Sequence, residues 1–207
     1  MSRPRQFDHD QVVGLAAEHF LLNGFEGASM RDLIAHTGLS SSSIYAAFGG
    51  KRGLYLAALK HAGVEERAQV EAALAGPGGV AGGLRVLYAV LIERLLSGAD
   101  RTVSLSARAA LESSDGDPEV MAHLKAHVED LRSLVAARLA EAQAAGEIRL
   151  RQEPRDLALF LLLSAFNLTF AIKLTRDKNS LEAFGAAALS TIEDAGQVHD
   201  PLQAERH

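Results

Sequence analysis

Cysteine is absent from the sequence, which excludes a disulfide framework, a thiolate metal site and a cysteine nucleophile. The first residues lack the apolar segment of a signal peptide, so we expect an intracellular protein located in the cytoplasm. The glycines at 76–83 lack the Gly-x-x-x-x-Gly-Lys-Ser/Thr pattern of a phosphate-binding loop, and the serines at 40–43 lack the Gly-x-Ser-x-Gly pattern of a hydrolase. We find no catalytic constellation, and we predict a protein that is not an enzyme and uses no cofactor.

The chain also lacks the strong positive charge of a protein that coats nucleic acid. Its formal net charge is −5, with 48% hydrophobic and 23% charged residues, a composition typical of a folded globular protein. Residues 1–60 hold six lysines and arginines against five aspartates and glutamates, a net charge of +1, which leaves −6 for the remainder. This asymmetry is compatible with DNA binding by the N-terminal part but does not require it.

Residues 29–48 carry the clearest structural pattern in the chain. Ser29 followed by Asp32 is typical of a capped helix start, and Gly38 suits the left-handed turn that ends a helix. Ser40 then predicts the cap of a second short helix. The side chains expected to anchor that helix in a core are Leu39, Ile44 and Phe48. Two short helices joined by a tight turn that contains glycine predict a helix-turn-helix.

The second of these helices has mostly small outward-facing residues, which would permit close approach to a DNA groove. They are Ser41, Ser42, Ser43, Tyr45 and Ala46. A helix–glycine–helix corner also occurs in all-helical proteins that have no role in DNA binding. The corner alone therefore leaves both interpretations open.

The register around the corner is more specific. It consists of Gly38-Leu39-Ser40, Ile44-Tyr45, Phe48, Lys51 and Leu54-Tyr55. This register closely resembles the N-terminal domain of the TetR family of bacterial repressors, from Phe7 to about Leu59. The resemblance implies an all-α protein, with an N-terminal three-helix helix-turn-helix domain followed by a helical-bundle domain for ligand binding and dimerisation.

The resemblance also implies a set of DNA contacts. Phosphate contacts are expected from Ser29, Arg31, Ser43, Tyr45 and Lys51, and base-edge contacts from Ser41, Ser42 and Ala46. Family members often carry lysine at position 41, glycine at position 42 and larger residues after the tyrosine, whereas this chain has small side chains at these positions. Because the recognition helix has little charge or reach, we expect Arg31 and an N-terminal arm containing Arg3 and Arg5 to carry more of the affinity.

The rest of the chain predicts helices only, about nine in total. They are expected near residues 8–22, 29–38, 40–48, 51–74, 84–96, 102–113, 118–142, 154–174 and 180–192. We divide the chain into a helix-turn-helix domain over residues 1–60, an effector-binding and dimerisation domain over residues 61–195, and a disordered tail over residues 196–207.

Residues 157–172 form the most apolar run. This run has sixteen residues, fewer than the roughly 20 that span a bilayer, and it includes Ser164, Asn167 and Thr169, so we expect no membrane span. In a TetR-like homodimer the last two helices pair with those of the second subunit. The expected interface residues are Phe160, Ala165, Leu168, Phe184, Gly185, Ala188, Leu189 and Ile192. A plain core is the alternative.

Regulators of this kind usually carry an effector pocket in the second domain, and the helices here offer a mostly apolar lining. The candidates are Tyr88, Ile92, Arg108, Glu112, His123, His127, Phe166 and Asn167, each of which could equally be ordinary core or surface. We expect a small, largely hydrophobic effector. His123 and His127 lie one helical turn apart and could share a metal with Glu112 or His61, but such pairs are common on exposed helix faces, and we predict no metal site.

These observations predict a homodimeric transcriptional repressor that a small molecule releases from double-stranded operator DNA. A helical ligand-binding or adaptor dimer that has lost sequence-specific DNA binding remains the alternative, because the recognition helix has little charge. The two differ at Lys51: its replacement by alanine should weaken binding to all DNA sequences only if the protein is a regulator.

Overall fold

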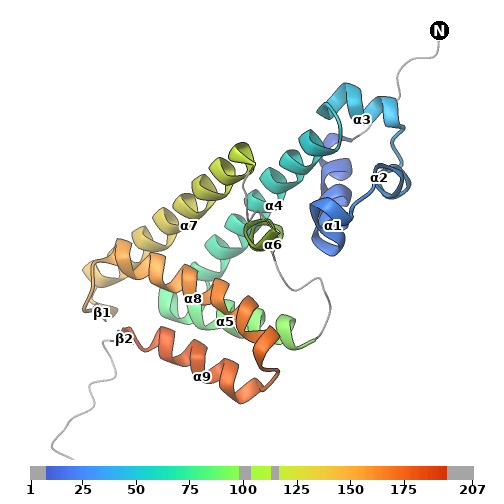
Figure 1. The fold of residues 1–207 in the computed structure, drawn as a ribbon. Helices are drawn as coiled ribbons and strands as arrows, with labels where there is room; N and C mark the ends of the chain where they lie inside the picture. The colour runs from blue at the N-terminus through green and yellow to red at the C-terminus, as the bar shows by residue number, and fades with distance from the viewer. Residues whose placement is uncertain (1–7, 98–103, 113–116, 195–207) are drawn as a thin grey trace, which may run out of the picture. The chain divides into compact units, whose positions relative to one another are not determined.

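The structure is a computed structural model. The residues it describes are 8–97, 104–112 and 117–194. Within these ranges the chain forms nine helices and two strands of three residues each (Figure 1). The predicted all-α fold is confirmed, and the short strands are an addition to it. The predicted arm with Arg3 and Arg5 and the predicted tail at 196–207 lie outside the described residues.

Contacts divide the chain into two compact units, each built from two separate segments of the sequence. Unit 1 consists of Met1–Gln69 and Ser97–Glu129, and unit 2 consists of Val70–Leu96 and Asp130–His207. The division expected near residue 60 falls inside α4 (Lys51–Leu74), which is one continuous helix. The helix α6 (Leu105–Glu112), expected in the second domain, belongs to unit 1, where it packs against α1 (His9–Gly27).

The helices of unit 1 begin and end where the capping residues direct. Besides α1, α4 and α6, this unit contains α2 (Met30–Thr37), α3 (Ser41–Phe48) and the first part of α7 (Pro118–Ala144). The side chains of Asp8, Ser29 and Ser40 accept hydrogen bonds from the first free amides of α1, α2 and α3. Gly38 and Gly49 close α2 and α3 with φ of 71° and 75°, a left-handed conformation that glycine adopts without strain.

The core of unit 1 holds these short helices in place. Its fully buried large side chains are Phe20, Leu33, Ile44, Leu54 and Leu59. The ring of Tyr55 contacts the rings of Phe20 and Phe25, with 4.9 Å between centroids in each pair. Ile44 and Leu39 are buried and Phe48 is half-buried, as the sequence predicts. Burying such a side chain contributes about 1.5–3 kcal/mol, so these residues fix which side of α3 faces outward.

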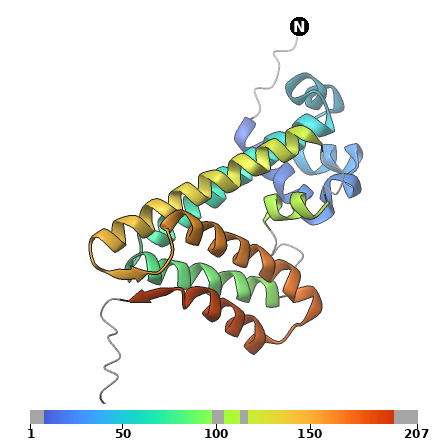
Figure 2. The same cartoon turned by 60° about the vertical axis from the view of Figure 1, so that its left-hand side comes forward.

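Unit 2 is built around three helices that pack side by side: α5 (Gly79–Leu96), α8 (Pro154–Leu174) and α9 (Lys178–Leu189) (Figures 1 and 2). Pro154 stands at the start of α8, as expected for a residue that needs no amide partner. The predicted cap of α9 is wrong by three residues. Asp177 is the cap, and its carboxylate accepts hydrogen bonds from the Ser180 amide at 2.9 Å and the Ser180 hydroxyl at 2.6 Å.

Two short strands lie in unit 2 where no strand was predicted. Strand β1 (Ile148–Leu150) pairs antiparallel with β2 (Ile192–Asp194), with Leu150 opposite Ile192. Ile192 was predicted on the last helix and at a subunit interface. It is instead buried in the core of unit 2, because α9 ends at Leu189 and the chain then becomes extended.

Other residues predicted at the interface also lie in the subunit's own core. Leu168 and Ala188 are buried beside Tyr88, and a Cβ on Gly185 would lie 3.2 Å from the Tyr88 ring. Ala165 and Leu189 are half-buried against the same cluster. Leu168, Gly185 and Ala188 are therefore covered by helices of their own chain, which corrects the interface prediction for these three residues. Of the eight predicted residues, Phe160 and Phe184 are the two that are exposed.

Helix α8 leaves much of its apolar surface uncovered. It has 21 residues with a mean hydropathy of 2.0 over an 18-residue window, and only 33% of that window is buried. By length and composition it could cross a membrane, as the core helices of many proteins could. Its exposed large apolar residues are Phe160, Leu163, Phe170 and Leu174. A helix of this kind needs a further apolar surface to cover it.

Candidate nucleic-acid interface

The turn between α2 and α3 is held by local hydrogen bonds. The Thr37 hydroxyl donates to the Leu33 carbonyl oxygen at 2.7 Å and accepts from the Leu39 amide at 3.4 Å. Gly38, between them, is exposed and has no atom within 4 Å of a Cβ built on it, so its positive φ is what requires glycine there. These contacts set the angle between the two helices of the corner.

The serines of α3 form a compact hydroxyl cluster. Ser40 Oγ lies 2.9 Å from Ser42 Oγ and 2.8 Å from Ser43 Oγ, and it accepts from the Ser43 amide at 3.1 Å. Ser41 is exposed, and its side chain has no hydrogen-bond partner within the described part of the chain. Ser42 and Ser43 are therefore bound to the helix cap, whereas the Ser41 hydroxyl can turn toward another molecule.

The remaining outward residues of α3 lie as predicted. Tyr45 is 58% exposed, and Ala46 is also exposed. The Tyr45 ring lies against Gly50, where a Cβ would come within 3.1 Å of a ring carbon. Gly50 has φ of 114°, which a side chain would strain. The turn after α3 thus supports the tyrosine ring from one side while more than half of the residue stays exposed.

The start of α2 presents a second polar group. The Ser29 hydroxyl donates to Asp32 Oδ2 at 2.5 Å, and the Asp32 amide donates back to Ser29 Oγ at 3.2 Å. The hydrogen bond from Ser29 lowers the pKa of the Asp32 carboxyl, and nearby Arg31 lowers it further. The Arg31 side chain is 92% exposed, with its Nε 3.7 Å from Asp32. Arg31 thus extends into solvent, with Asp32 as a neighbouring carboxylate.

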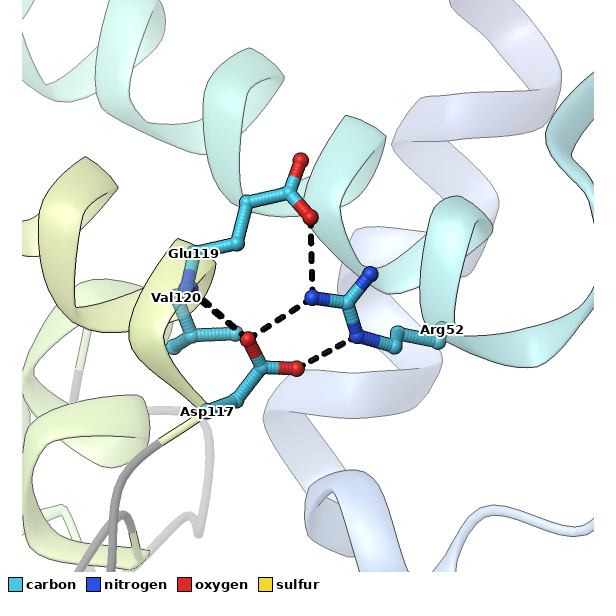
Figure 3. Close-up of polar contacts among 4 residues, drawn as sticks. All are labelled: Arg52, Asp117, Glu119 and Val120. Carbon is cyan, nitrogen blue, oxygen red and sulfur yellow. Dashed lines mark hydrogen bonds and ion pairs between the residues drawn. The ribbon is translucent and has the colours of Figure 1, made fainter.

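The first turn of α4 carries two adjacent cations and no acidic residue. Lysine and arginine at a helix N-terminus oppose the helix dipole, so each needs a compensating contact. Lys51 places its Nζ 4.4 Å from the centroid of the Phe25 ring, a favourable cation–π contact. Arg52 instead pairs with Asp117 and Glu119 at the start of α7 (Figure 3).

Two of the predicted effector-pocket residues have a different place. Gly24 breaks the helical hydrogen bonding of α1 with φ of 72°, and the Phe25 amide donates to Glu112 Oε2 at 3.1 Å. Arg108 donates from Nη1 to the Leu21 carbonyl at 2.8 Å and from Nε to Glu112 at 2.7 Å. The ion pair of Arg108 and Glu112 therefore replaces the missing helical hydrogen bond between the Phe25 amide and the Leu21 carbonyl. The sequence pattern does not predict this contact between α6 and α1.

The two histidines of α7 make contacts within unit 1. His127 is buried, with its Nε2 3.1 Å from Glu66 Oε2, and its ring stacks on that of His123 at 6.4 Å between centroids. Burial lowers the pKa of the His123 imidazole. Among the described residues, no three histidine, cysteine, aspartate or glutamate side chains converge on a possible metal position. Of the two further ligands considered, Glu112 accepts from the Phe25 amide in α1, and His61 pairs with Glu65.

The other effector candidates lie in unit 2. Tyr88 and Ile92 line an open groove of about 440 Å³ between α5 and α9, together with Glu93, Gly185 and Leu189. The Tyr88 hydroxyl donates to the Leu161 carbonyl at 2.7 Å, and burial raises the pKa of Tyr88 to about 12. Two further candidates lie on α8, where Phe166 is half-buried and Asn167 is exposed.

Comparison with known proteins agrees with this geometry. Residues 13–58 match the family model for bacterial regulatory proteins of the tetR family, and residues 104–188 match the tetracyclin repressor-like C-terminal domain. The chain is 30% identical over 196 residues to the uncharacterised HTH-type transcriptional regulator YezE of Bacillus subtilis, which covers 93% of this chain and 100% of YezE. The chain belongs to the TetR family.

Relatives of this TetR-family chain include proteins that bind DNA. The structure of CifR with a 26-base-pair operator has a TM-score of 0.74 and 29% identity, covering 91% of this chain and 98% of CifR. The reduced form of Escherichia coli NemR has a TM-score of 0.80 at 18% identity, covering 90% and 98% of the two chains, and so supports the fold. The repressor ComR of Escherichia coli is 39% identical over 57 residues, 28% of this chain and 27% of ComR. This TetR-family protein is a DNA-binding transcriptional regulator.

Proposed function

We propose that this regulator is a homodimeric repressor that binds a near-palindromic operator through two copies of α3 and leaves it when a small, largely hydrophobic effector binds. The observation that carries the proposal is the outward side of α3, where small exposed side chains stand on a buried, capped and glycine-bounded helix. Two copies would enter successive major grooves about 34–36 Å apart. The site of action is the cytoplasm, and the proposal includes no catalytic role.

The proposed DNA contacts follow from which side chains are available. Ser41 and Ala46 are proposed to face the bases, whereas the Ser42 hydroxyl lies 2.9 Å from Ser40 Oγ at the helix start. Serine can donate to or accept from a base edge, and an alanine methyl can contact a thymine methyl. The proposed phosphate contacts are Ser29, Arg31, Ser43, Tyr45 and Lys51, with Ser42 supporting the helix start. Since few of these side chains are charged, we expect moderate affinity for each half-site.

The proposed dimer uses the uncovered face of α8. Its exposed apolar residues at 160, 163, 170 and 174 repeat at intervals that place them on one side of the helix, and exposed Phe184 lies on neighbouring α9. Pairing this face with its copy would remove these side chains from water. Asn167 lies in the same row, where the facing chain could supply a hydrogen bond, whereas a lipid tail could not.

The dimer can be tested by sedimentation at micromolar concentration. We expect the wild-type chain to sediment as a dimer, and Phe170→Asp, which puts a charge on the exposed face, to give folded monomers. Leu111→Asp, an exposed apolar residue of unit 1, is the matched control and should remain dimeric. A wild-type monomer that binds phospholipid vesicles would overturn the dimer and favour a lipid contact for α8.

The proposed effector binds without covalent chemistry at a thiol. The CifR structures carry substituted cysteines and the NemR structure is described as a reduced form, whereas this sequence has no cysteine. The groove between α5 and α9 supports this proposal, because the predicted residues Tyr88 and Ile92 line it together with Gly185. Because α6 follows α5 along the chain and is bonded to the break in α1, we propose α6 as the link to the DNA-binding helices.

The effector can be sought by thermal-shift screening of small apolar compounds, followed by measurement of DNA release. A compound that raises the melting temperature should weaken DNA binding of the wild-type chain. Gly185→Leu should abolish its binding, because an added side chain meets Tyr88 and Ile92. If stabilising compounds leave DNA affinity unchanged, the proposed effector response is wrong. If they act equally on Gly185→Leu, the groove is not their site.

A further inference from the structure

Arg52 and the carboxylates of Asp117 and Glu119 form a cluster beside the start of α4 (Figure 3). Arg52 donates from Nε to Asp117 Oδ2 at 2.5 Å and from Nη2 to Asp117 Oδ1 at 2.8 Å. Its Nη2 also lies 2.8 Å from Glu119 Oε2. A bidentate contact of this kind fixes the guanidinium in orientation as well as in position. Two of the three guanidinium nitrogens are therefore turned toward α7.

The contact with Arg52 favours the charged form of the Asp117 carboxyl. The Arg52 guanidinium holds the pKa of the Asp117 carboxyl at about 2, and the Glu119 and Val120 amides, which donate to Asp117, add to this effect. Without Arg52, two negative charges would lie near the first turn of α4, at a distance no greater than the length of an arginine side chain. That first turn also carries Lys51, the proposed phosphate contact, so the charges would repel the same phosphates.

The neighbouring cations of α4 thus have different partners. Lys51 lies over an aromatic ring, which leaves its ammonium hydrogens able to donate to an anion. Arg52 is held by two carboxylates and has little left to offer a phosphate. Two adjacent cations at the start of a helix could both bind phosphate, but here Lys51 and Arg52 have different partners.

We propose that Arg52 is a positioning residue for DNA binding: it masks the charges of Asp117 and Glu119 beside the start of α4 and leaves Lys51 as the phosphate-binding cation of that turn. The inference rests on the proposed DNA-binding face. It assigns to Arg52 an electrostatic effect on DNA that acts through the two carboxylates and requires no phosphate contact. The effect depends on charge, so removing the carboxylates should compensate for removing Arg52.

The test compares charge variants on one DNA. A labelled duplex selected by the wild-type protein from a random-sequence pool serves as the probe. The variants are Arg52→Gln, the triple variant Arg52→Gln/Asp117→Asn/Glu119→Gln, and Arg138→Gln. Asparagine at position 117 can still cap α7, so the triple variant keeps the helix start. Arg138 pairs with Glu71 and Glu141 in unit 2, and its replacement controls for the loss of any paired arginine.

Arg52→Gln should weaken binding on the order of tenfold, because each of the two subunits gains one uncompensated negative charge near the phosphates. The triple variant should bind no more than about threefold more weakly than the wild type. Its affinity should fall with salt at the same slope as that of the wild type. Arg138→Gln should bind like the wild type. Melting temperatures of all four proteins show whether an affinity change follows a loss of folding.

Three outcomes would overturn the inference. A triple variant as weak as Arg52→Gln, with a salt slope reduced by about 1, would make Arg52 a direct phosphate ligand. An Arg52→Gln variant that binds like the wild type would remove the electrostatic effect. Affinity that falls only in step with melting temperature, with no recovery in the triple variant, would make the cluster purely structural. If the selection returns no bound DNA for the wild type, the proposed function itself fails, which is a separate result.

Discussion

The ion pair of Arg108 and Glu112 should stabilise unit 1 more than a surface ion pair does. It occupies a break in α1, where Gly24 turns away from helical geometry and leaves the Leu21 carbonyl and the Phe25 amide without their usual partners. A backbone group left unsatisfied in a partly buried place costs about 1–3 kcal/mol. Glycine is required at position 24 by the same contact, since a Cβ there would lie 2.2 Å from a Glu112 carboxylate oxygen.

We expect Arg108→Met to destabilise the protein by about 2 kcal/mol, because it removes a charged donor to Leu21 and leaves Glu112 uncompensated. Glu112→Ala should cost a similar amount by removing the acceptor for the Phe25 amide. The double variant should cost about 1 kcal/mol less than the sum, because each single change already breaks the shared contact. For a chain of this length, 2 kcal/mol corresponds to about 4–8 °C in melting temperature.

The measurement is thermal unfolding followed by circular dichroism at fixed protein concentration. Lys178→Met provides the control, since Lys178 pairs with Glu93 on an exposed surface, with side chains 52% and 62% accessible. Exposed pairs of this kind contribute little to stability. Single-variant losses no larger than that of the control, or losses that simply add in the double variant, would refute the view that the ion pair replaces a helical hydrogen bond.

Three further predictions concern other parts of the fold. Gly53→Ala should lower the stability by about 3 kcal/mol or prevent folding, because its Cβ would lie 1.7 Å from the Phe48 carbonyl oxygen; a melting temperature within 2 °C of wild type would contradict this. Burial raises the pKa values of Tyr55 and Tyr88 to about 12. The protonated phenols of these two tyrosines contribute fully to stability below pH 10, and this contribution is lost as pH rises toward 12. Alkaline titration should therefore show unfolding between pH 10 and 12. Ionisation of both phenols at pH 10 without unfolding would contradict the prediction. Ser40→Ala should cost about 1 kcal/mol by removing the cap of α3, measurable by urea unfolding, whereas Ser40→Asp should cost little.

Local signals in the sequence were sufficient for most helix positions. Lys51–Leu74 forms one helix as predicted, and Pro118 and Pro154 lie at helix starts. Such starts can be predicted from the sequence because proline and capping side chains act only on adjacent residues. Ile192 could not be placed in the same way. Its apolar spacing fits a helix, but a strand formed because Leu150, 42 residues earlier, supplies a partner.

The candidate sites show the same division. Exposure of Ser41, Tyr45 and Ala46 follows from the apolar pattern of α3, which the sequence contains in full. The role of Glu112 depends on a hydrogen bond to residue 25, 87 positions away, and no local pattern predicts it. Leu168 has the spacing of an interface residue, but a buried apolar face has the same appearance in sequence whether its cover comes from the same chain or from another.

The central claim, sequence-specific DNA binding by α3 with Lys51 on a phosphate, is tested most directly by fluorescence anisotropy. Labelled DNA that flanks the protein's own gene, duplexes selected from random sequence, and mixed-sequence DNA of equal length would be titrated across a salt series. We expect at least one specific duplex to bind ~10³ times more tightly than the mixed sequence, with a steep salt slope that Lys51→Ala reduces by about 1. Equal, weak binding to all duplexes, unchanged by Lys51→Ala, would contradict the account.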